Sequence, residues 1–352
     1  MPVYHALAEH GRFEQVLVCN PAHVRNVPGR KTDAVDAAWL AELLECGLLR
    51  GSYLPRAEVK AVRDVARYRK KLVGQRTSEL QRLGGVLQDA GIKLDSVASS
   101  IGTVSGRSMI EALIDGERRG VVLAELARGR MRVKIPDLAV ALEGRFGEHH
   151  ALLCRLHLDH IDHLDAMIER LDAQVEAMMV PFARPRELVV SVPGLGPVSS
   201  AAVLAEIGTN PAEFFATHAH LASWTGLCPG NHESAGKRKH GKPRKGNQHV
   251  ASLLVEAAWS AVRTEGRLKA RYRRLVLRFG GFGNPAAKKK AIFAIAHTLI
   301  VIIWQVLTSD TFYADLGADF YQRHADPDRE SRRLVAKLEA LGHKVTLEPV
   351  AA

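Results

Sequence analysis

Apolar residues recur three or four positions apart along most of this chain, which is the spacing of one face of an α-helix. Two such stretches are long and dense in charge, residues 56–97 and 149–179. Long apolar stripes with charged flanks are typical of coiled-coil-like arms and helical hairpins that pair subunits. We therefore predict a helical arm over residues 56–180. Its stripes comprise Val59, Val62, Val65, Leu72, Leu80, Leu83 and Leu87, then Leu152, Leu156, Ile161, Leu164, Ile168, Leu171, Val175 and Met178.

Two features of the pattern invite a functional interpretation but have a simpler one. His157, His160 and His163 recur at helical spacing, yet no cysteine or carboxylate pattern completes a known metal-ligand set around them, so we expect solvated helix residues. The most apolar run, residues 291–307, contains His297 and is shorter than the about 20 residues that a bilayer span requires. We predict a buried core helix there.

Residues 191–208, SVPGLGPVSSAAVLAEIG, place a turn rich in proline and glycine between two apolar helices. This order predicts a helix–hairpin–helix. In such a motif a tight glycine turn presents backbone N–H groups at a helix N-terminus, where a phosphate binds readily. Gly194 and Gly196 are therefore candidate phosphate contacts.

The charge balance favours a polyanionic partner. The chain has 49 Lys and Arg against 38 Asp and Glu, and its sequence pI is near 9.6. Nucleic acid is the leading candidate, because the basic residues are clustered. A membrane-surface protein usually has a basic amphipathic segment with Trp or Phe on its apolar face, and we find none. The four cysteines form no CxxC pair, which argues against a zinc knuckle or a disulfide framework and favours the reducing cytoplasm.

The stretch from Leu221 to Asn247 follows neither helix nor strand periodicity. It contains one candidate hydroxyl nucleophile, Ser234, followed by a basic run with interspersed glycines. Lys and Arg supply charge, and the glycines let backbone N–H groups approach a phosphate backbone. A solvated surface loop has the same composition, so the residues alone leave both interpretations open. The basic residues are Lys237, Arg238, Lys239, Lys242, Arg244 and Lys245.

Two carboxylates, Asp33 and Asp36, lie three positions apart in a helix predicted over residues 31–46, with Thr32 as its N-cap. Side chains at this spacing are neighbours, about 5–6 Å apart at Cβ, and can share one divalent metal ion. Acidic residues at a helix N-terminus also complement the helix dipole, and the two residues by themselves favour that simpler role.

Several of these segments together resemble the DEDD transposases of bacterial insertion sequences. The matching residues are PGLGP in the hairpin turn, the block ASWTGLCPGNHESAGKRKHGKPRKGN, the helix that begins LLVEAAW, the block GRKTDAVDA at residues 29–37 and DLGADFYQRH near the C-terminus. The resemblance covers most of the chain from Lys31 onward, and the serine block is specific. In this family a RuvC-like domain is joined to a C-terminal domain that bears a catalytic serine.

The resemblance implies a function and a set of roles. Ser234 would be the nucleophile on a DNA phosphodiester, and Asp33 and Asp36 would be the last two carboxylates of the DEDD set, binding Mg²⁺ or another divalent metal. The six basic residues of the serine block, with Gly194 and Gly196, would bind DNA. The family also implies a structured guide RNA from the element and a homo-oligomeric synapse.

The first Asp and the Glu of the DEDD set have no match here, because Glu9 and Glu14 are the only acidic residues before Asp33 and neither fits the motif. We therefore expect an N-terminally truncated chain that lacks the first strands of the RuvC-like sheet. This leaves an alternative function, a non-catalytic nucleic-acid-binding remnant of a transposase.

The predicted fold is mostly α with a partial α/β segment of the RuvC or RNase H type. The predicted function is site-specific DNA recombination by an insertion-sequence transposase in the cytoplasm, without membrane attachment. Its predicted parts are the partial RuvC-like domain at 1–55, the helical arm at 56–180, the C-terminal transposase domain with the helix–hairpin–helix and serine block at 181–310, and a tail at 311–352.

Overall fold

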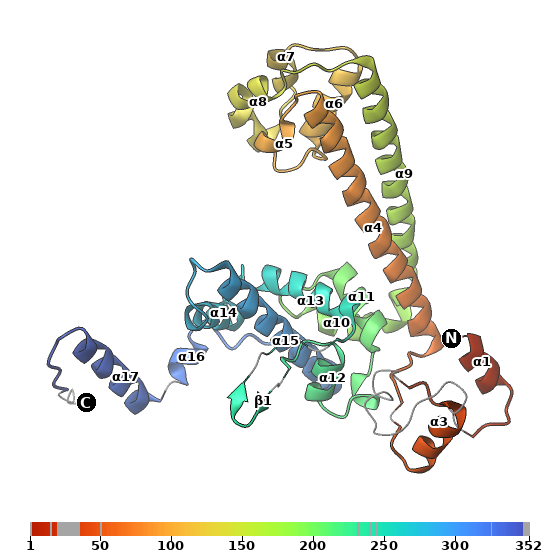
Figure 1. The fold of residues 1–352 in the computed structure, drawn as a ribbon, viewed down its shortest axis with the longest axis vertical. Helices are drawn as coiled ribbons and strands as arrows, with labels where there is room; N and C mark the ends of the chain where they lie inside the picture. The colour runs from red at the N-terminus through yellow and green to blue at the C-terminus, as the bar shows by residue number, and fades with distance from the viewer. Residues whose placement is uncertain are drawn as a thin grey trace.

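The computed structural model describes residues 2–14, 16–19, 36–49, 51–230, 233–238, 241, 243, 245–324 and 326–347. These residues are mostly helical, as predicted from the apolar spacing. A long two-helix arm rises from a helical body, with the N-terminal segment beside the base of the arm and the C-terminal helix at the other end of the body (Figure 1).

The arm is made of α4 (Ala57–Asp89) and α9 (Glu148–Met179), which pack against each other in opposite directions. Leu72 from α4 meets Leu164 and Ile168 from α9 in a small buried cluster at mid-length. Salt bridges across the pair, Arg69 with Asp172 and Arg76 with Asp165, flank this seam. The packing carries α4 without a break through three glycines that weaken its intrinsic helix propensity.

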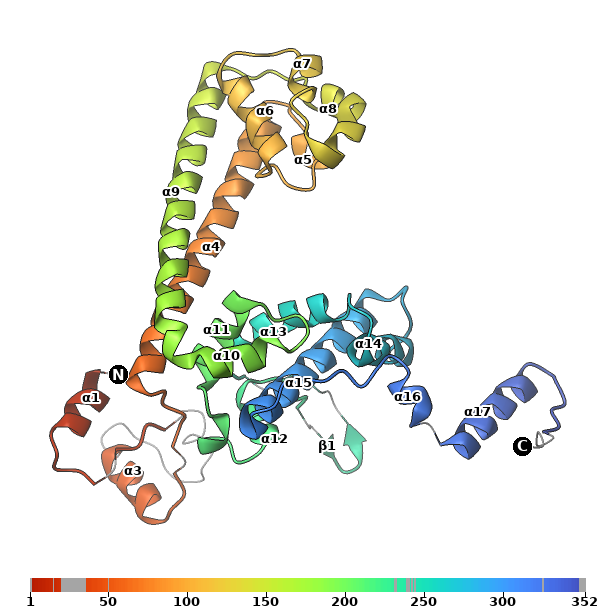
Figure 2. The ribbon, with the colours of Figure 1, turned by 180° about the vertical axis from the view of Figure 1, so that it is seen from behind.

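A small helical cap with its own core closes the far end of the arm (Figure 2). Its central side chains, Met109, Leu123 and Leu138, are fully buried. At the end of α9 nearest the cap, the side chains that pack in the cap core are Cys154 and Leu158. The prediction that Leu152 and Leu156 belong to the packed stripe is therefore wrong. These two leucines are 62% and 56% exposed. The cap consists of α5 (Leu94–Val97), α6 (Val104–Ile114), α7 (Gly120–Ala124), η2 (Gly129–Lys134) and α8 (Ile135–Ala141).

Of the two arm histidines nearest Glu79, His157 differs from the expected solvated residue, with its side chain 22% exposed, whereas the side chain of His160 is 51% exposed, as expected. His157 Nδ1 lies 2.8 Å from Oε2 of Glu79, and His160 Nδ1 lies 3.4 Å from Oε1 of the same carboxylate. Glu79 is 5% exposed and also pairs with Arg82. The histidines therefore compensate the buried charge of Glu79 on the facing helix. Glu79 lies 78 residues from His157 in the sequence, so spacing within α9 does not reveal this contact.

The body is assembled around α15 (Pro285–Ser309), whose length and hydropathy are sufficient for a membrane span. It is instead packed in the core, which confirms the predicted buried helix: Ile292, Ile295 and Leu299 are at most 1% exposed. The same core includes Val62 of α4 and Val175 of α9, so the base of the arm is rooted in the body. The surrounding elements are η3 (Val180–Phe182), α10 (Ala183–Val190), α11 (Pro197–Ile207), η4 (Pro211–Glu213), α12 (His218–Trp224), α13 (Gln248–Ala261) and α14 (Arg267–Arg278).

The N-terminal segment contributes α1 (Pro2–Glu9) and α3, which is described from Asp36 to Glu45. Its described residues contain an isolated bridge between Cys19 and Gly51 and no strand. The α/β character expected for residues 1–55 therefore stays a prediction, as does the division of the chain into four parts.

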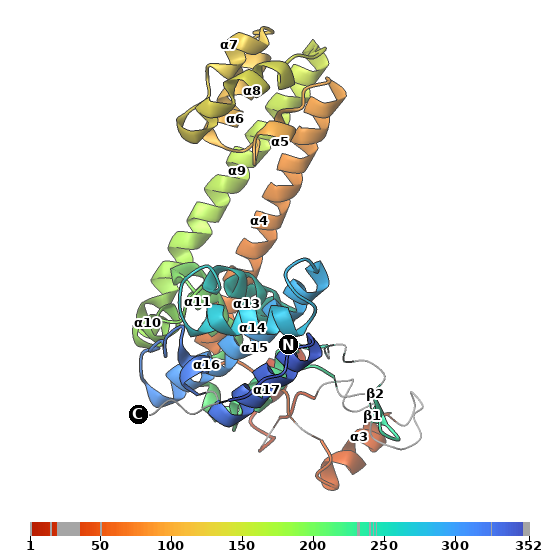
Figure 3. The same cartoon turned by 90° about the vertical axis from the view of Figure 1, so that its left-hand side faces the viewer.

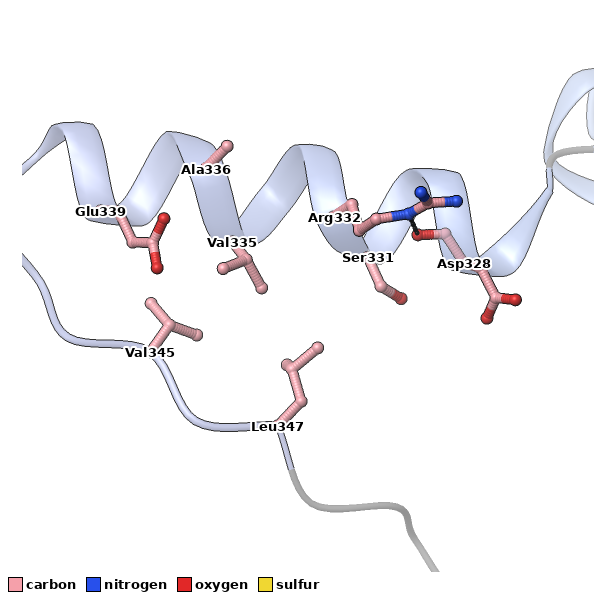
Figure 4. A pocket seen from close by; sticks show the side chains of 8 residues that line it. All are labelled: Asp328, Ser331, Arg332, Val335, Ala336, Glu339, Val345 and Leu347. Carbon is pink, nitrogen blue, oxygen red and sulfur yellow. Dashed lines mark hydrogen bonds between the residues drawn. The ribbon is translucent and has the colours of Figure 1, made fainter.

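The tail carries α16 (Phe320–Arg323) and α17 (Pro327–Ala340). The chain after α17 folds back along it, and Val345 and Leu347 face Val335 across a shallow hollow (Figure 4). Arg332 Nε donates to the backbone oxygen of Asp328, 3.2 Å away, within the helix. The hollow is lined by one helix and its own extension, so it belongs to the tail.

Candidate active site

The serine of the basic block lies in a tight hairpin. Strands β1 (Glu233–Ser234) and β2 (Lys237–Arg238) pair antiparallel, with Ser234 opposite Lys237. The two residues between them, Ala235 and Gly236, have φ values of 50° and 72°. Positive φ at both central positions is the signature of a type I′ turn, whose twist matches that of a two-residue hairpin. The backbone of Ser234 is thus set beside the turn, and the hairpin stands out from the helical body (Figure 3).

The serine loop, defined here as residues 227–245, is closed at its base. Asn247 N donates to Trp224 O across 3.2 Å, and Pro229 and Pro243 form an isolated bridge. Gly246 lies so close to the start of the loop that a Cβ on it would be 2.3 Å from the nitrogen of Gly226. The two ends of the loop therefore lie against each other at its base.

Asn247 also fixes the helix that follows. Its Oδ1 accepts hydrogen bonds from the backbone nitrogens of His249 and Val250 at 3.0 and 3.3 Å, which caps α13. Its Nδ2 donates to Oε2 of Glu206, 2.7 Å away on α11. The loop base is therefore joined to two helices of the body through one side chain.

The predicted phosphate contacts of the block are only partly in the described structure. Lys237 and Lys245 are exposed, and Arg238 lies in β2. Lys239, Lys242 and Arg244 lie outside the described residues. For Ser234 and Arg238 the structure describes the backbone but not the side chain.

The two predicted metal ligands fall at the edge of the described structure. Asp33 lies outside it, whereas Asp36 is described as the first residue of α3, without its side chain. The element α3 overlaps the serine hairpin in the view of Figure 3 but stands apart from it in Figure 1, so the two elements do not lie side by side.

The hairpin between α10 and α11 separates its two glycines into different environments. Gly194 has a φ of 86°, and a Cβ on it would be 2.2 Å from the oxygen of Ala257 in α13. Gly196 is exposed, has nothing within 4 Å of a Cβ position, and donates its N–H to Ser199 Oγ at 2.8 Å. Gly194 thus packs the turn onto α13, while Gly196 faces outward at the N-terminus of α11.

A cavity of about 610 Å³ lies beside Gly196, between α4, α11 and α13. Its wall carries Arg67, Arg69 and Lys70 of the arm, and Lys70 Nζ donates to Ser252 Oγ at 2.6 Å. Burial and the positive charges of Arg67 and Lys70 lower the pKa of His249, which also lines the cavity. We did not predict this basic wall, although the run RYRKK at residues 67–71 is its sequence signal.

A second basic surface lies on α14. Arg267, Arg271, Arg274 and Arg278 recur at the spacing of one helix face. The guanidinium of Arg267 lies 5.4 Å from the ring centre of Phe320, and that of Arg274 lies 4.5 Å from Tyr321.

The tail holds this surface in place. Arg271 Nη1 donates to the hydroxyl of Tyr321 at 3.5 Å, and Asp315 accepts from the backbone nitrogen of Arg267 at 3.1 Å at the start of α14. Within the described part of the chain, Nε of Arg267 and Nε of Arg271 are buried and have no hydrogen-bond partner. A bound water molecule or ion would satisfy such donors.

Asp89, His149 and His150 are close enough together to hold a metal ion. The hydrogen bonds of His150 argue against this use. Its Nδ1 accepts from the backbone nitrogen of Gly147 at 3.0 Å, so Nε2 of the neutral ring carries the hydrogen and donates to Asp89 Oδ2 at 3.0 Å. Both nitrogens are engaged, and His150 acts as a capping residue of α9.

Comparison with known proteins agrees with the resemblance of the motifs. Residues 186–273 match the model of the transposase IS116/IS110/IS902 family, and residues 1–92 match a DEDD transposase model of the IS110 type. The chain is 30% identical to a probable family 20 transposase of Pseudomonas aeruginosa over 289 residues, which is 82% of this chain and 75% of that protein. It is 24% identical to the transposase for insertion sequence element IS1111A of Coxiella burnetii, over 84% of this chain and 71% of the relative. The chain therefore belongs to the IS110/IS116/IS902 family of insertion-sequence transposases.

Proposed function

We propose that this chain is a DNA transposase that cuts and rejoins DNA by site-specific recombination, with Ser234 as the nucleophile. The observation that carries the proposal is the serine loop. A hydroxyl residue beside a tight turn stands out from the body on a segment dense in Lys and Arg, and the loop is closed at its base. Family membership supports the same assignment.

In the proposed step Oγ of Ser234 forms a bond to phosphorus, and the bond from phosphorus to one sugar oxygen breaks. The hydroxyl proton leaves Oγ, and the departing sugar oxygen takes up a proton. One DNA end is then held as a phosphoserine diester, which a sugar hydroxyl of the partner strand resolves by the reverse step. Because phosphodiester number is conserved, rejoining needs no external energy source.

Asp33 and Asp36 are the proposed ligands of Mg²⁺ or another divalent ion. Hard cations of this kind bind carboxylate oxygens, and a bound ion stabilises charge on the phosphoryl oxygens. The description of α3 begins at Asp36, and Asp33 lies outside the described residues, so the placement of the two ligands in the first turns of this helix stays a prediction.

Several basic groups are proposed to hold the nucleic acid. The loop supplies Lys237, Arg238, Lys239, Lys242, Arg244 and Lys245, and the turn between α10 and α11 supplies the exposed backbone at Gly196. Arg67 and Lys70 of the cavity wall and the α14 arginines extend this basic surface. Contacts of this type position a nucleic acid without reading its sequence.

The proposed partners are DNA, a structured guide RNA from the element and further copies of this chain. The exposure of Leu152 and Leu156 on one face of α9 supports pairing of subunits through the arm, since large apolar side chains on adjacent turns favour association. We place the activity in the cytoplasm, where the element and its transcript reside.

The test uses the full chain, a labelled DNA junction substrate, element RNA and Mg²⁺, followed by denaturing electrophoresis. We expect a covalent protein–DNA adduct that is absent in Ser234→Ala. Ser223→Ala is the matched control, because Ser223 is exposed on α12 near the loop base and should leave the adduct unchanged. An adduct that persists in Ser234→Ala would refute the nucleophile assignment. Salt-dependent binding without any adduct in the unmodified chain would favour the non-catalytic nucleic-acid-binding alternative.

A further inference from the structure

One buried carboxylate, Glu206, joins the arm, the body and the base of the serine loop. It lies near the C-terminal end of α11 and is 4% exposed. Arg67 of α4 donates from Nε to Oε1 at 2.6 Å and from Nη2 to Oε2 at 2.9 Å. Carboxylates are almost never buried this completely unless they are paired, and the two-pronged arginine contact fixes the geometry as well as the charge.

A second arginine of the arm binds the same end of α11. Arg63 donates from Nε to the backbone oxygen of Ala205 and from Nη2 to that of Glu206, each at 2.8 Å. These carbonyls belong to the last turn of the helix, where acceptors lack partners within the helix and a positive charge is favoured. Its guanidinium also lies over the ring of Tyr53 at 5.4 Å, so the N-terminal segment shares the junction.

The charge on Glu206 is maintained by these partners. Burial alone raises the pKa of Glu206, but hydrogen bonds from Arg67 and Asn247 and the charges of Arg67 and Arg63 outweigh it and lower that pKa. The carboxylate is therefore ionised at neutral pH. Its removal would leave Arg63, whose side chain is 13% exposed, without its compensating charge.

Asn247 extends the junction to the serine loop. The amide that donates to Glu206 belongs to the residue whose backbone nitrogen bonds Trp224 and whose Oδ1 caps α13. A continuous series of direct contacts therefore runs from Arg67 through Glu206 and Asn247 to the closed base of the loop that carries Ser234.

We propose that Glu206 is a positioning residue, which holds the serine loop in a fixed relation to the arm so that Ser234 meets its phosphate. Glu206 lies at the base of the loop, whereas Ser234 lies at its tip, so the effect is transmitted through Asn247. The role rests on the proposed recombination function.

An exchange of side chains tests this link without losing the cap of α13. Asn247→Ser keeps an oxygen acceptor for the cap and removes the amide donor to Glu206. Glu206→Gln breaks the charged contact with Arg67. The double variant Glu206→Gln with Asn247→Asp exchanges carboxylate and amide, so it retains the total charge and restores a hydrogen bond between the two positions.

Two measurements are made on each variant. The first is hydrogen exchange of residues 227–245 in the protein alone. The second is the rate of adduct formation at saturating DNA, together with the Kd for DNA. We expect each single variant to exchange about tenfold faster in the loop and to form the adduct about tenfold more slowly, with Kd nearly unchanged, since a hydrogen bond to a charged group is removed. The double variant should recover most of both effects.

The outcomes separate the link from the proposed function. Loop exchange equal to that of the unmodified chain in both single variants would overturn the inference. Faster loop exchange with an unchanged adduct rate would also overturn it, because the contact would then be structural only. If the unmodified chain forms no adduct, the proposed function fails, and the hydrogen-exchange result with its recovery in the double variant still decides whether Glu206 holds the loop.

Discussion

Replacement of Gly194 by alanine should destabilise the body strongly, whereas the same change at Gly196 should have little effect. Gly194 has a φ of 86°, a conformation that costs a residue with a Cβ about 1–2 kcal/mol. The added Cβ would also lie 2.2 Å from the oxygen of Ala257 and 2.9 Å from the nitrogen of Ala261. Both atoms belong to backbone of α13, which cannot rotate away, so overpacking adds about 1–3 kcal/mol.

The expected loss for Gly194→Ala is therefore about 2–5 kcal/mol of unfolding free energy. Tryptophan fluorescence in a urea titration is a suitable measurement, because Trp224, Trp259 and Trp304 all lie in the body. Gly196→Ala is the matched control. Nothing lies within 4 Å of its Cβ position, so the expected loss is only about 0.5–1 kcal/mol, from alanine in place of glycine at the N-cap of α11.

The same pair of variants separates packing from phosphate binding. Gly196→Ala keeps the backbone N–H but adds a methyl group on the exposed face of the turn, so weaker binding in a DNA titration would indicate that a phosphate approaches there. A Gly194→Ala protein as stable as the unmodified chain would refute the reasoning, since both the conformation and the close approach to Ala257 would then be wrong.

Three further outcomes are expected. Alanine at residues 237–239 should make the slope of log affinity against log salt less negative, by up to about 0.9 for each duplex phosphate that these side chains no longer neutralise. Fluorescence anisotropy of labelled DNA across a KCl series measures this slope. An unchanged slope would exclude these residues as DNA-binding residues. Leu152→Glu with Leu156→Glu should shift the chain toward monomer in light scattering, because two exposed apolar side chains become charged; unchanged mass would place the subunit interface elsewhere. The lowered folded-state pKa of Glu206 means that its stabilising contribution is fully present above its unfolded pKa, about 4.3, and is lost as pH falls through the lower folded value. Glu206→Gln should therefore flatten the acid limb of the unfolding free energy, and an acid limb that keeps its slope in this variant would contradict the assignment.

The sequence predicts the arm because a helical period can be recognised from nearby residues alone, without knowledge of the helix that packs against them. It predicts the phase of the α9 stripe less well. Leu152 and Leu156 have helical spacing, but near the cap the buried positions are His150, Cys154 and Leu158. A period specifies which residues share a face, whereas the neighbouring element decides which face is buried.

The candidate site likewise has one part that a local sequence pattern predicts and another part that it does not. The composition and turn chemistry of the serine block are local, so Ser234 and the basic run can be recognised without knowledge of the hairpin. Glu206 cannot, because in the segment AAVLAEIG it reads as one acidic residue in an apolar helix. Its partner Arg67 lies 139 residues away, and no local pattern indicates that contact.

The position of Ser234 raises a problem that the junction helps to answer. A lone two-stranded hairpin has marginal stability in water, and Ala235 adds the strain of a positive φ at a residue with a Cβ. The orientation of a side chain on such an element depends on the anchors at the two ends of the loop. The described anchors are Trp224, Gly246 and Asn247, and Asn247 is held by Glu206 and through it by the arm. Anchors at the base of the loop, with Ser234 beside the turn at its tip, suit the proposed role in which this serine would attack one strand and later release it to another.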